Sequence, residues 1–172
     1  MSESFEFREA THFTTGAIGD PGSRVFYLQA GDASSYVSVK VEKQQMSALA
    51  GFLRTVLDDL PAPDEPHTAS VNLIEPALPE WVVGQIAVGV EEVESKIIIV
   101  VEELSFEDED EDDDDHLLGL EHTGASLRIQ ITPSQAESFI LTADALMTSG
   151  RPPCRLCGQP EDPAGHACPR LN

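Results

Sequence analysis

One pattern of residues occurs twice in this chain and limits the folds that it can adopt. Residues 127–147 read LRIQITPSQAESFILTADALM. Apolar and polar residues alternate at the start, which predicts a half-buried strand, and apolar residues then recur at helical spacing, which predicts an amphipathic helix. Thr132, Pro133 and Gln135 suit the N-cap, first and third positions of that helix, because Gln135 can bond the backbone N–H of the cap.

The same pattern stands 90 residues earlier in the chain. Val37, Val39 and Val41 take the place of the alternating strand residues, and Gln45 takes the place of Gln135. The apolar face of the later helix superposes without a gap on Met46, Leu49, Ala50, Leu53, Val56 and Leu57. We therefore expect a two-fold internal repeat in which each half ends in a strand and a helix.

The remaining strands extend this repeat over each half. WVVGQIA at 81–87 matches FTTGAIG at 13–19 with a shift of 68. Short turns between the strands favour antiparallel pairing. The sequence thus predicts an α+β fold of two pseudo-symmetric βββα repeats, which form an antiparallel sheet or a barrel with two helices. The expected strands are 12–19, 24–30, 36–41, 81–87, 96–101 and 127–131, and the expected helices are 43–60 and 133–147.

The length sets the domain organisation. The 172 residues, 41% of them hydrophobic, are enough for one core and a small appendage. We expect residues 1–149 to form the duplicated domain and residues 150–172 to form a tail. Residues 61–70 are typical of a Pro-rich linker between the halves, and residues 105–124 form an acid-rich loop inserted in the second half.

The composition argues against several classes of partner. A formal charge of −21 disfavours direct binding of DNA or RNA, because their phosphates would be repelled. No apolar run approaches the ~20 residues of a membrane-spanning helix, and the N-terminus lacks the basic and apolar regions of a secretion signal. We therefore expect a cytoplasmic protein with no membrane partner. Nothing in the pattern indicates an oligomeric state.

The strongest chemical motif is Cys154-x-x-Cys157 followed by His166-x-Cys168. Thiols seldom pair in a reducing compartment, which favours metal binding over a disulfide. Two thiolates three residues apart can hold one edge of a Zn²⁺ tetrahedron, and a histidine with a third thiolate completes it. Because four protein ligands leave no position for water or substrate, the predicted role of the zinc is structural.

Two other interpretations of this tail are an unfolded segment with solvated thiols and a redox Cys-x-x-Cys of the thioredoxin kind. The redox interpretation is disfavoured, because Gly158 and Pro160 prevent a helix from starting at the motif and lowering a thiol pKa. The loop between the two ligand pairs is short and poor in apolar residues. Metal coordination would therefore have to supply its free energy of folding.

Two sets of charged residues are further candidates. Residues 107–115 are nine consecutive carboxylates, which favour a solvated, self-repelling loop over a site for a divalent cation or a basic partner. Separately, cations and amides of both halves can hold a small anionic ligand such as a nucleotide phosphate, unless they are surface residues that balance an acidic molecule. These candidate ligand-binding residues are Arg24, Gln29, Lys43, Gln45 and Arg128.

Three motifs, GDPGSRVFYLQA at 19–30, VEKQQ at 41–45 and GRPPCRLCGQPEDPAGHACPRLN at 150–172, resemble a bacterial family of conserved hypothetical proteins designated a domain of unknown function. The resemblance covers nearly the whole chain, including a Cys-x-x-Cys-Gly…Gly-His-x-Cys-Pro-Arg ending. It implies no activity, substrate or catalytic residue. The typical ending has Pro-Leu-Cys-Gly, whereas Arg155 precedes Leu156 here, and the acid-rich insertion is also unusual for the family.

Two functions are consistent with these patterns. The first is an uncharacterised zinc-binding interaction or adaptor module, in which the zinc knuckle and a sheet edge face another protein. The second is a protein that binds a small anion or nucleotide, including an enzyme, through Arg24, Lys43 and Arg128. A pocket that gathers those cations would favour the second function, and dispersed cations would remove it.

Overall fold

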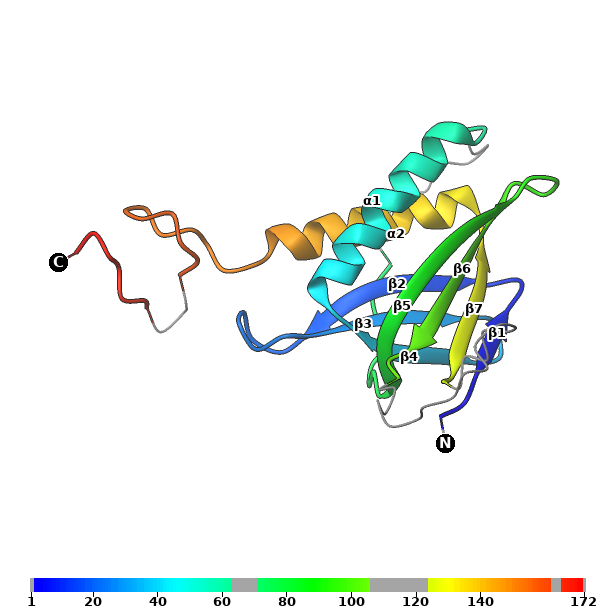
Figure 1. The fold of residues 1–172 in the computed structure, drawn as a ribbon, viewed down its shortest axis with the longest axis horizontal. Helices are drawn as coiled ribbons and strands as arrows, with labels where there is room; N and C mark the ends of the chain where they lie inside the picture. Colours follow the sequence, from blue (N-terminus) through cyan, green and yellow to red (C-terminus); the bar gives the residue numbers. More distant parts are fainter. Residues whose placement is uncertain (1, 63–70, 106–123, 162–164, 172) are drawn as a thin grey trace, which may run out of the picture.

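The computed structural model describes residues 2–62, 71–105, 124–161 and 165–171, and its architecture is α+β (Figure 1). In these parts of the chain seven strands form one sheet, and both helices lie on the same side of it. The predicted α+β class is therefore confirmed. The strands are β1 Phe5–Phe7, β2 His12–Ile18, β3 Val25–Gly31, β4 Tyr36–Val41, β5 Pro79–Glu91, β6 Lys96–Glu103 and β7 Ser126–Ile131. The helices are α1 Lys43–Asp59 and α2 Pro133–Thr148.

The strands follow the order β1-β7-β6-β5-β4-β3-β2. Neighbours within each half pair antiparallel, as their short turns predict. The prediction of an all-antiparallel sheet is wrong at two places, because β5 pairs parallel to β4 and β1 pairs parallel to β7. The chain passes through α1 between β4 and β5, and such a long connection allows parallel neighbours. With β1 and β2 at its two edges, the sheet is an open one rather than a closed barrel.

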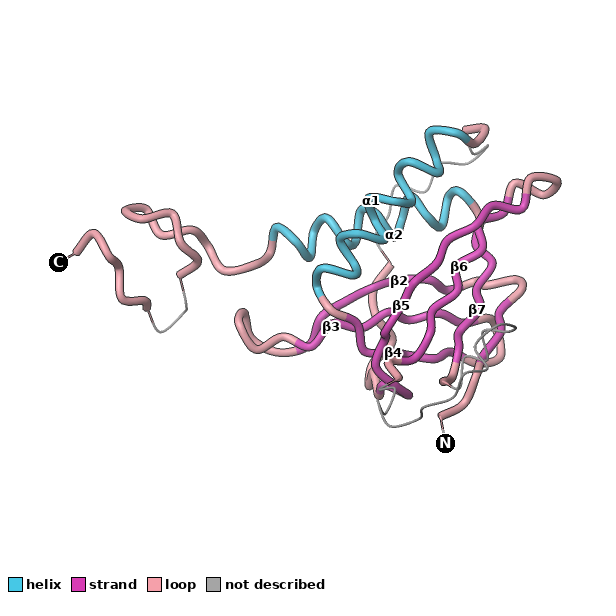
Figure 2. Tube along the Cα trace, in the orientation of Figure 1, coloured by secondary structure: helices cyan, strands magenta, loops and turns pink. Residues whose placement is uncertain are grey.

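The core fills the space between the sheet and the helices. The alternating apolar residues of β4 and β7 are buried, as the sequence predicts. Phe13 of β2 and Phe139 of α2 stack with their ring centroids 4.7 Å apart, which joins the second helix to an edge strand of the first half. The helices cross each other over strands that change direction strongly between β2–β4 and β5–β7 (Figure 2).

The start of α1 is fixed by one glutamine. Oε1 of Gln45 accepts a hydrogen bond from the backbone N–H of Glu42, the N-cap residue, at 2.9 Å. Nε2 of the same side chain donates to the carbonyl oxygens of Val83 and Gly84 in β5, at 3.2 and 3.1 Å. Gln45 therefore caps its own helix and fastens it to a strand of the other half.

The start of α2 is built in the same way. Thr132 is the N-cap, Pro133 follows it, and Oε1 of Gln135 accepts from the N–H of Thr132 at 2.8 Å, as predicted. Nε2 of Gln135 donates to the carbonyl oxygen of Ala10 at 2.6 Å. Each helix is thus held at its first turn to a backbone carbonyl group that precedes the other helix in the chain, in β5 for α1 and between β1 and β2 for α2.

The tail follows α2 and lies beyond the end of that helix, away from most of the sheet (Figure 1). Its separation from residues 1–149 as a second unit stays a prediction. The run of carboxylates at 107–115 lies outside the described residues. No helix in the described parts of the chain is long and apolar enough to cross a membrane.

Gln45→Ala is expected to lower the free energy of unfolding by about 1–2 kcal/mol, because the N–H of Glu42 and two carbonyl oxygens of β5 lose their partner. Gln44→Ala is the matched control, since Gln44 is its exposed neighbour in the same helical turn. The control is expected to change stability by less than about 0.5 kcal/mol. Urea denaturation followed by circular dichroism measures both, and equal losses would contradict the bridging role of Gln45.

Candidate metal centre

A short hairpin in the tail brings the first two cysteines together. Pro153 pairs with Pro160 as an isolated antiparallel bridge, and the N–H of Cys154 donates to the carbonyl oxygen of Gln159 at 2.8 Å. The N–H of Gly158 donates back to the carbonyl oxygen of Cys154, also at 2.8 Å. Gly158 has φ +73°, a left-handed conformation that favours glycine. The glycine after the second cysteine is therefore what allows the turn.

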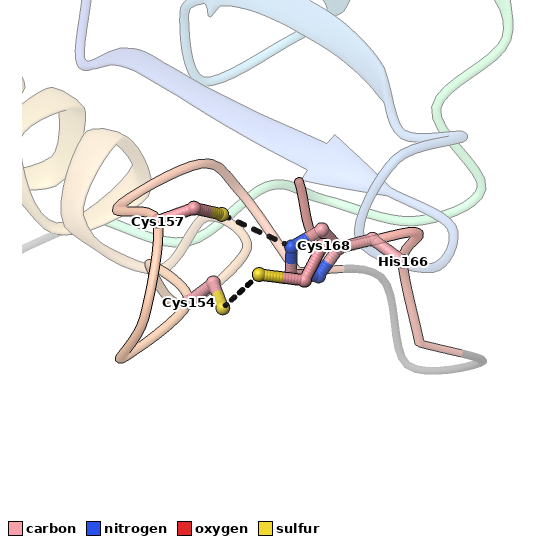
Figure 3. Close-up of side chains that lie close together, drawn as sticks. All are labelled: Cys154, Cys157, His166 and Cys168. Atoms are coloured by element: carbon pink, nitrogen blue, oxygen red, sulfur yellow. Dashed lines mark hydrogen bonds between the residues drawn. The ribbon is translucent and has the colours of Figure 1, made fainter. Parts of the chain in front are cut away.

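The four predicted ligands converge at this hairpin (Figure 3). Sγ of Cys154 lies 4.0 Å from Sγ of Cys168, and Sγ of Cys157 lies 3.2 Å from Nε2 of His166. All four ligand atoms lie within 4.8 Å of one another. Sulfur atoms of a tetrahedral zinc site with Zn–S bonds of about 2.3 Å stand about 3.8 Å apart. The cluster therefore has the dimensions of a metal site.

The surroundings of the cluster leave the ligand atoms facing one another. Cys154 and Cys168 are buried, although the tail has few apolar residues. Nε2 of His166 faces the thiol of Cys157, while its Nδ1 is buried and has no hydrogen-bond partner among the described residues. The histidine thus presents one nitrogen to the sulfur atoms, as a metal ligand must.

The thiols influence each other's ionisation. Backbone N–H groups of Cys157 and Leu156 point at Sγ of Cys154 and lower the pKa of that thiol, which favours the thiolate. The N–H of Gln159 acts in the same direction on Cys157, but burial and the thiols of Cys168 and Cys154 raise the pKa of Cys157 overall. These opposite shifts favour the thiolate at Cys154 and the neutral thiol at Cys157. A cation among the sulfur atoms would favour the thiolate form of each cysteine.

Two of the predicted ligand-binding residues, Gln29 and Gln45, form hydrogen bonds that hold parts of the fold together. Gln45 caps α1, as described above. Gln29 is fully buried in β3, where its Oε1 lies 2.7 Å from Nε2 of His12 and accepts from the N–H of Ile74 at 2.8 Å. Its Nε2 donates to Oγ of Ser38 and to the carbonyl oxygen of Ile74, at 2.9 and 3.0 Å. Gln29 therefore attaches the segment before β5 to the sheet.

The three predicted cations are only partly brought together. Arg24 and Lys43 line one cavity of about 390 Å³, beside the end of α2. Arg128 lies elsewhere, on β7, with Nε 3.8 Å from a carboxylate oxygen of Glu6. The cavity has a further cation, Arg151, which the sequence pattern does not single out. Its place depends on how the tail leaves α2, and no local pattern encodes that.

Comparison with known protein families identifies the chain. The family described as "Protein of unknown function (DUF3090)" matches residues 5–168. The chain belongs to this family. The match includes every strand and helix described above and the four candidate metal ligands of this DUF3090 protein, so the resemblance to a family of unknown function is confirmed. No curated protein and no solved structure matches the chain.

Cys157→Ser is expected to remove the bound metal from this DUF3090 protein, because three ligands and a weaker hydroxyl replace a closed thiolate site. Leu156→Ser is the control, since Leu156 stands between the same two cysteines in the sequence and its side chain is exposed. It is expected to keep about one ion per chain. Mass spectrometry of metals in the purified proteins measures the content. If Cys157→Ser and the wild type contained the same amount of metal per chain, a metal centre at these four residues would be excluded.

Proposed function

We propose that this protein is a zinc-binding interaction or adaptor module, in which a structural Zn²⁺ orders the tail. The convergence of Cys154, Cys157, His166 and Cys168 within 4.8 Å carries this proposal. Three thiolates and one imidazole are a donor set that Zn²⁺ accepts in tetrahedral geometry. Since four protein donors close the coordination sphere, the ion stabilises the tail and does not bind substrate.

The surface around the cluster supports a protein partner. Leu156 is 49% exposed and Leu171 is 72% exposed, on a segment that metal binding would hold in one conformation. Apolar side chains on a preorganised frame cost little conformational entropy when a partner covers them. A protein is a better partner than a nucleic acid, because the chain has a formal charge of −21. The three cysteines are free thiols, which suits the cytoplasm.

Replacement of the native metal by Co²⁺ tests the coordination. A site with three sulfur ligands and one nitrogen ligand is expected to show strong visible bands of tetrahedral cobalt and a near-ultraviolet band of sulfur-to-cobalt charge transfer. Titration of the metal-free protein, followed by absorption spectroscopy, measures these bands. Weak visible bands without charge transfer would indicate oxygen ligands in an octahedral site, and would contradict the proposed centre.

The exposed leucines of the tail test the adaptor role. The double variant Leu156→Ser with Leu171→Ser is expected to keep its zinc and to lose the partner proteins that the wild type captures from cell extract, because the apolar contact is removed. Leu78→Ser, at a site 73% exposed outside the tail, is the matched control and is expected to keep them. Quantitative mass spectrometry of the captured proteins measures the difference. Identical sets from all three proteins would refute binding through the tail.

A second candidate function is the binding of a small anion. The observation in its favour is that Arg24 and Lys43, two of the three predicted cations, line the same cavity. The three cations singled out from the sequence are not the proposed site together, because Arg128 lies beside Glu6 instead.

We also propose that the two halves are an internal repeat. The glutamines at the starts of the helices, Gln45 and Gln135, make corresponding hydrogen bonds, and their acceptors Val83 and Ala10 are 73 residues apart. Arg54 of α1 forms an ion pair with Asp144 of α2 at 2.6 Å, so positions 90 residues apart meet between the helices. Such contacts are what a two-fold arrangement of equivalent units produces.

The sheet register also supports an offset of 73 residues between the early parts of the two halves. Val39 of β4 and Ile129 of β7 correspond at a distance of 90 residues. The paired positions of the sheet lead from Val39 across β3 to Thr15 of β2. In the same way they lead from Ile129 across β6 to Val88 of β5. Thr15 and Val88 are 73 residues apart, which supports 73 rather than 68 as the offset of the first strands.

The repeat makes a quantitative prediction for the second helix. Gln135→Ala is expected to destabilise the protein as Gln45→Ala does, to within about 1 kcal/mol, because each glutamine accepts from the N–H of its N-cap residue and donates to backbone before the other helix. Urea denaturation of the two variants side by side measures both losses. A cost for one variant and none for the other would argue against equivalent roles.

A further inference from the structure

A cavity outside the metal centre gathers positive charge. It has a volume of about 390 Å³ and lies where the end of α2 meets the turn between β2 and β3 and the first residue of α1. Arg24, Lys43 and Arg151 line it, and none of the described residues that line it is acidic. The chain has 31 acidic and 10 basic residues. Among the described residues, this cavity therefore gathers cations although the molecule as a whole is strongly acidic.

Arg24 is oriented by the end of α2. Its Nη1 donates to the carbonyl oxygen of Ser149 at 3.1 Å and lies 3.0 Å from Oγ of the same residue, the C-cap of the helix. The guanidinium offsets the partial negative charge that a helix carries at its C-terminus. The end of the helix therefore does not cancel the attraction of the other two cations for an anion.

The other two cations each lie beside a glycine. A Cβ atom on Gly150 would lie 3.6 Å from Nζ of Lys43, so the chain leaves α2 directly beside the ammonium group. A Cβ atom on Gly22 would lie 2.5 Å from Nη2 of Arg151, so this guanidinium lies flat against the turn between β2 and β3. Gly22 has φ +101°, which also favours glycine there. Gly22 therefore allows the guanidinium of Arg151 to lie against this turn, and the ammonium group of Lys43 lies within contact distance of Gly150.

Apolar side chains form much of the remaining wall, and the cavity leaves room for more than an ion. Phe26, Leu146 and Met147 line the cavity beside the cations. A volume of about 390 Å³ lies within the usual range of small-molecule sites, about 300–1,000 Å³. Guanidinium and ammonium groups bind phosphate through charge-assisted hydrogen bonds.

We propose that this cavity is a binding site for a small organic phosphate. The dianionic phosphate lies among the three cations. The organic part packs on the apolar wall. This site goes beyond the metal-binding role of the tail and names the ligand class of the second candidate function, small-anion binding, on which it rests. Two of its cations, Arg24 and Lys43, belong to the body of the fold.

Isothermal titration of the full, metal-loaded chain with phenyl phosphate tests the site, with inorganic phosphate and phenol as partial ligands. Phenyl phosphate is expected to bind at least about fivefold more tightly than inorganic phosphate, because its ring covers the apolar wall. Phenol is expected not to bind. The affinity for phenyl phosphate is expected to fall as salt is raised, because the cavity is open to solvent.

Lys43→Gln and Arg151→Gln are each expected to weaken binding of phenyl phosphate at least about fivefold, since each removes a charge-assisted contact. Arg128→Gln is the matched control and is expected to bind as wild type does. Circular dichroism and metal content show that each variant is folded and metal-loaded. Lys43→Gln leaves the tail intact and so separates failure of this site from loss of the metal centre. Absence of binding to wild type at millimolar phenyl phosphate, or equal affinity of Lys43→Gln and wild type, would overturn the proposal.

Discussion

The structure depends on how its two helices begin. In each half a single residue, Glu42 or Thr132, separates the third strand from the helix, so the helix must turn back over the sheet at once. The first turn of a helix leaves backbone N–H groups without partners. Gln45 and Gln135 satisfy one of these groups and at the same time bind a carbonyl oxygen before the other helix. The direction of each helix is therefore set by the opposite half.

This arrangement also decides where charged groups can meet. Because the helices cross over the sheet, Arg54 reaches Asp144 between them. The same crossing brings the first residue of α1 close to the end of α2, where the chain turns into the tail. Lys43, Arg24 and Arg151 come from a helix start, a strand start and the tail, yet they line one cavity. The concentration of positive charge is thus a consequence of topology rather than of local sequence.

The sequence predicts what local chemistry determines. Capping at Thr132 and Gln135 involves neighbouring residues only, and the alternation in β4 and β7 follows from burial of one face. The four candidate metal ligands also lie within 4.8 Å of one another, and their spacing in the sequence is the signal that singles them out. The parallel pairing of β1 is different, since three residues, Phe5–Phe7, form a strand only beside β7. Gln29 looks like an exposed polar residue until residues distant in sequence cover it.

The two proposed sites share one stretch of backbone. Arg151 lines the cavity, and three residues later Cys154 begins the hairpin that holds two metal ligands. Pro160, the bridge partner of Pro153 in that hairpin, also lines the cavity. The tail has too few apolar residues to hold this geometry by burial alone, so the proposed metal ion would stabilise the hairpin. If both sites are filled as proposed, thermodynamic linkage requires that each ligand changes the binding affinity of the other by the same factor.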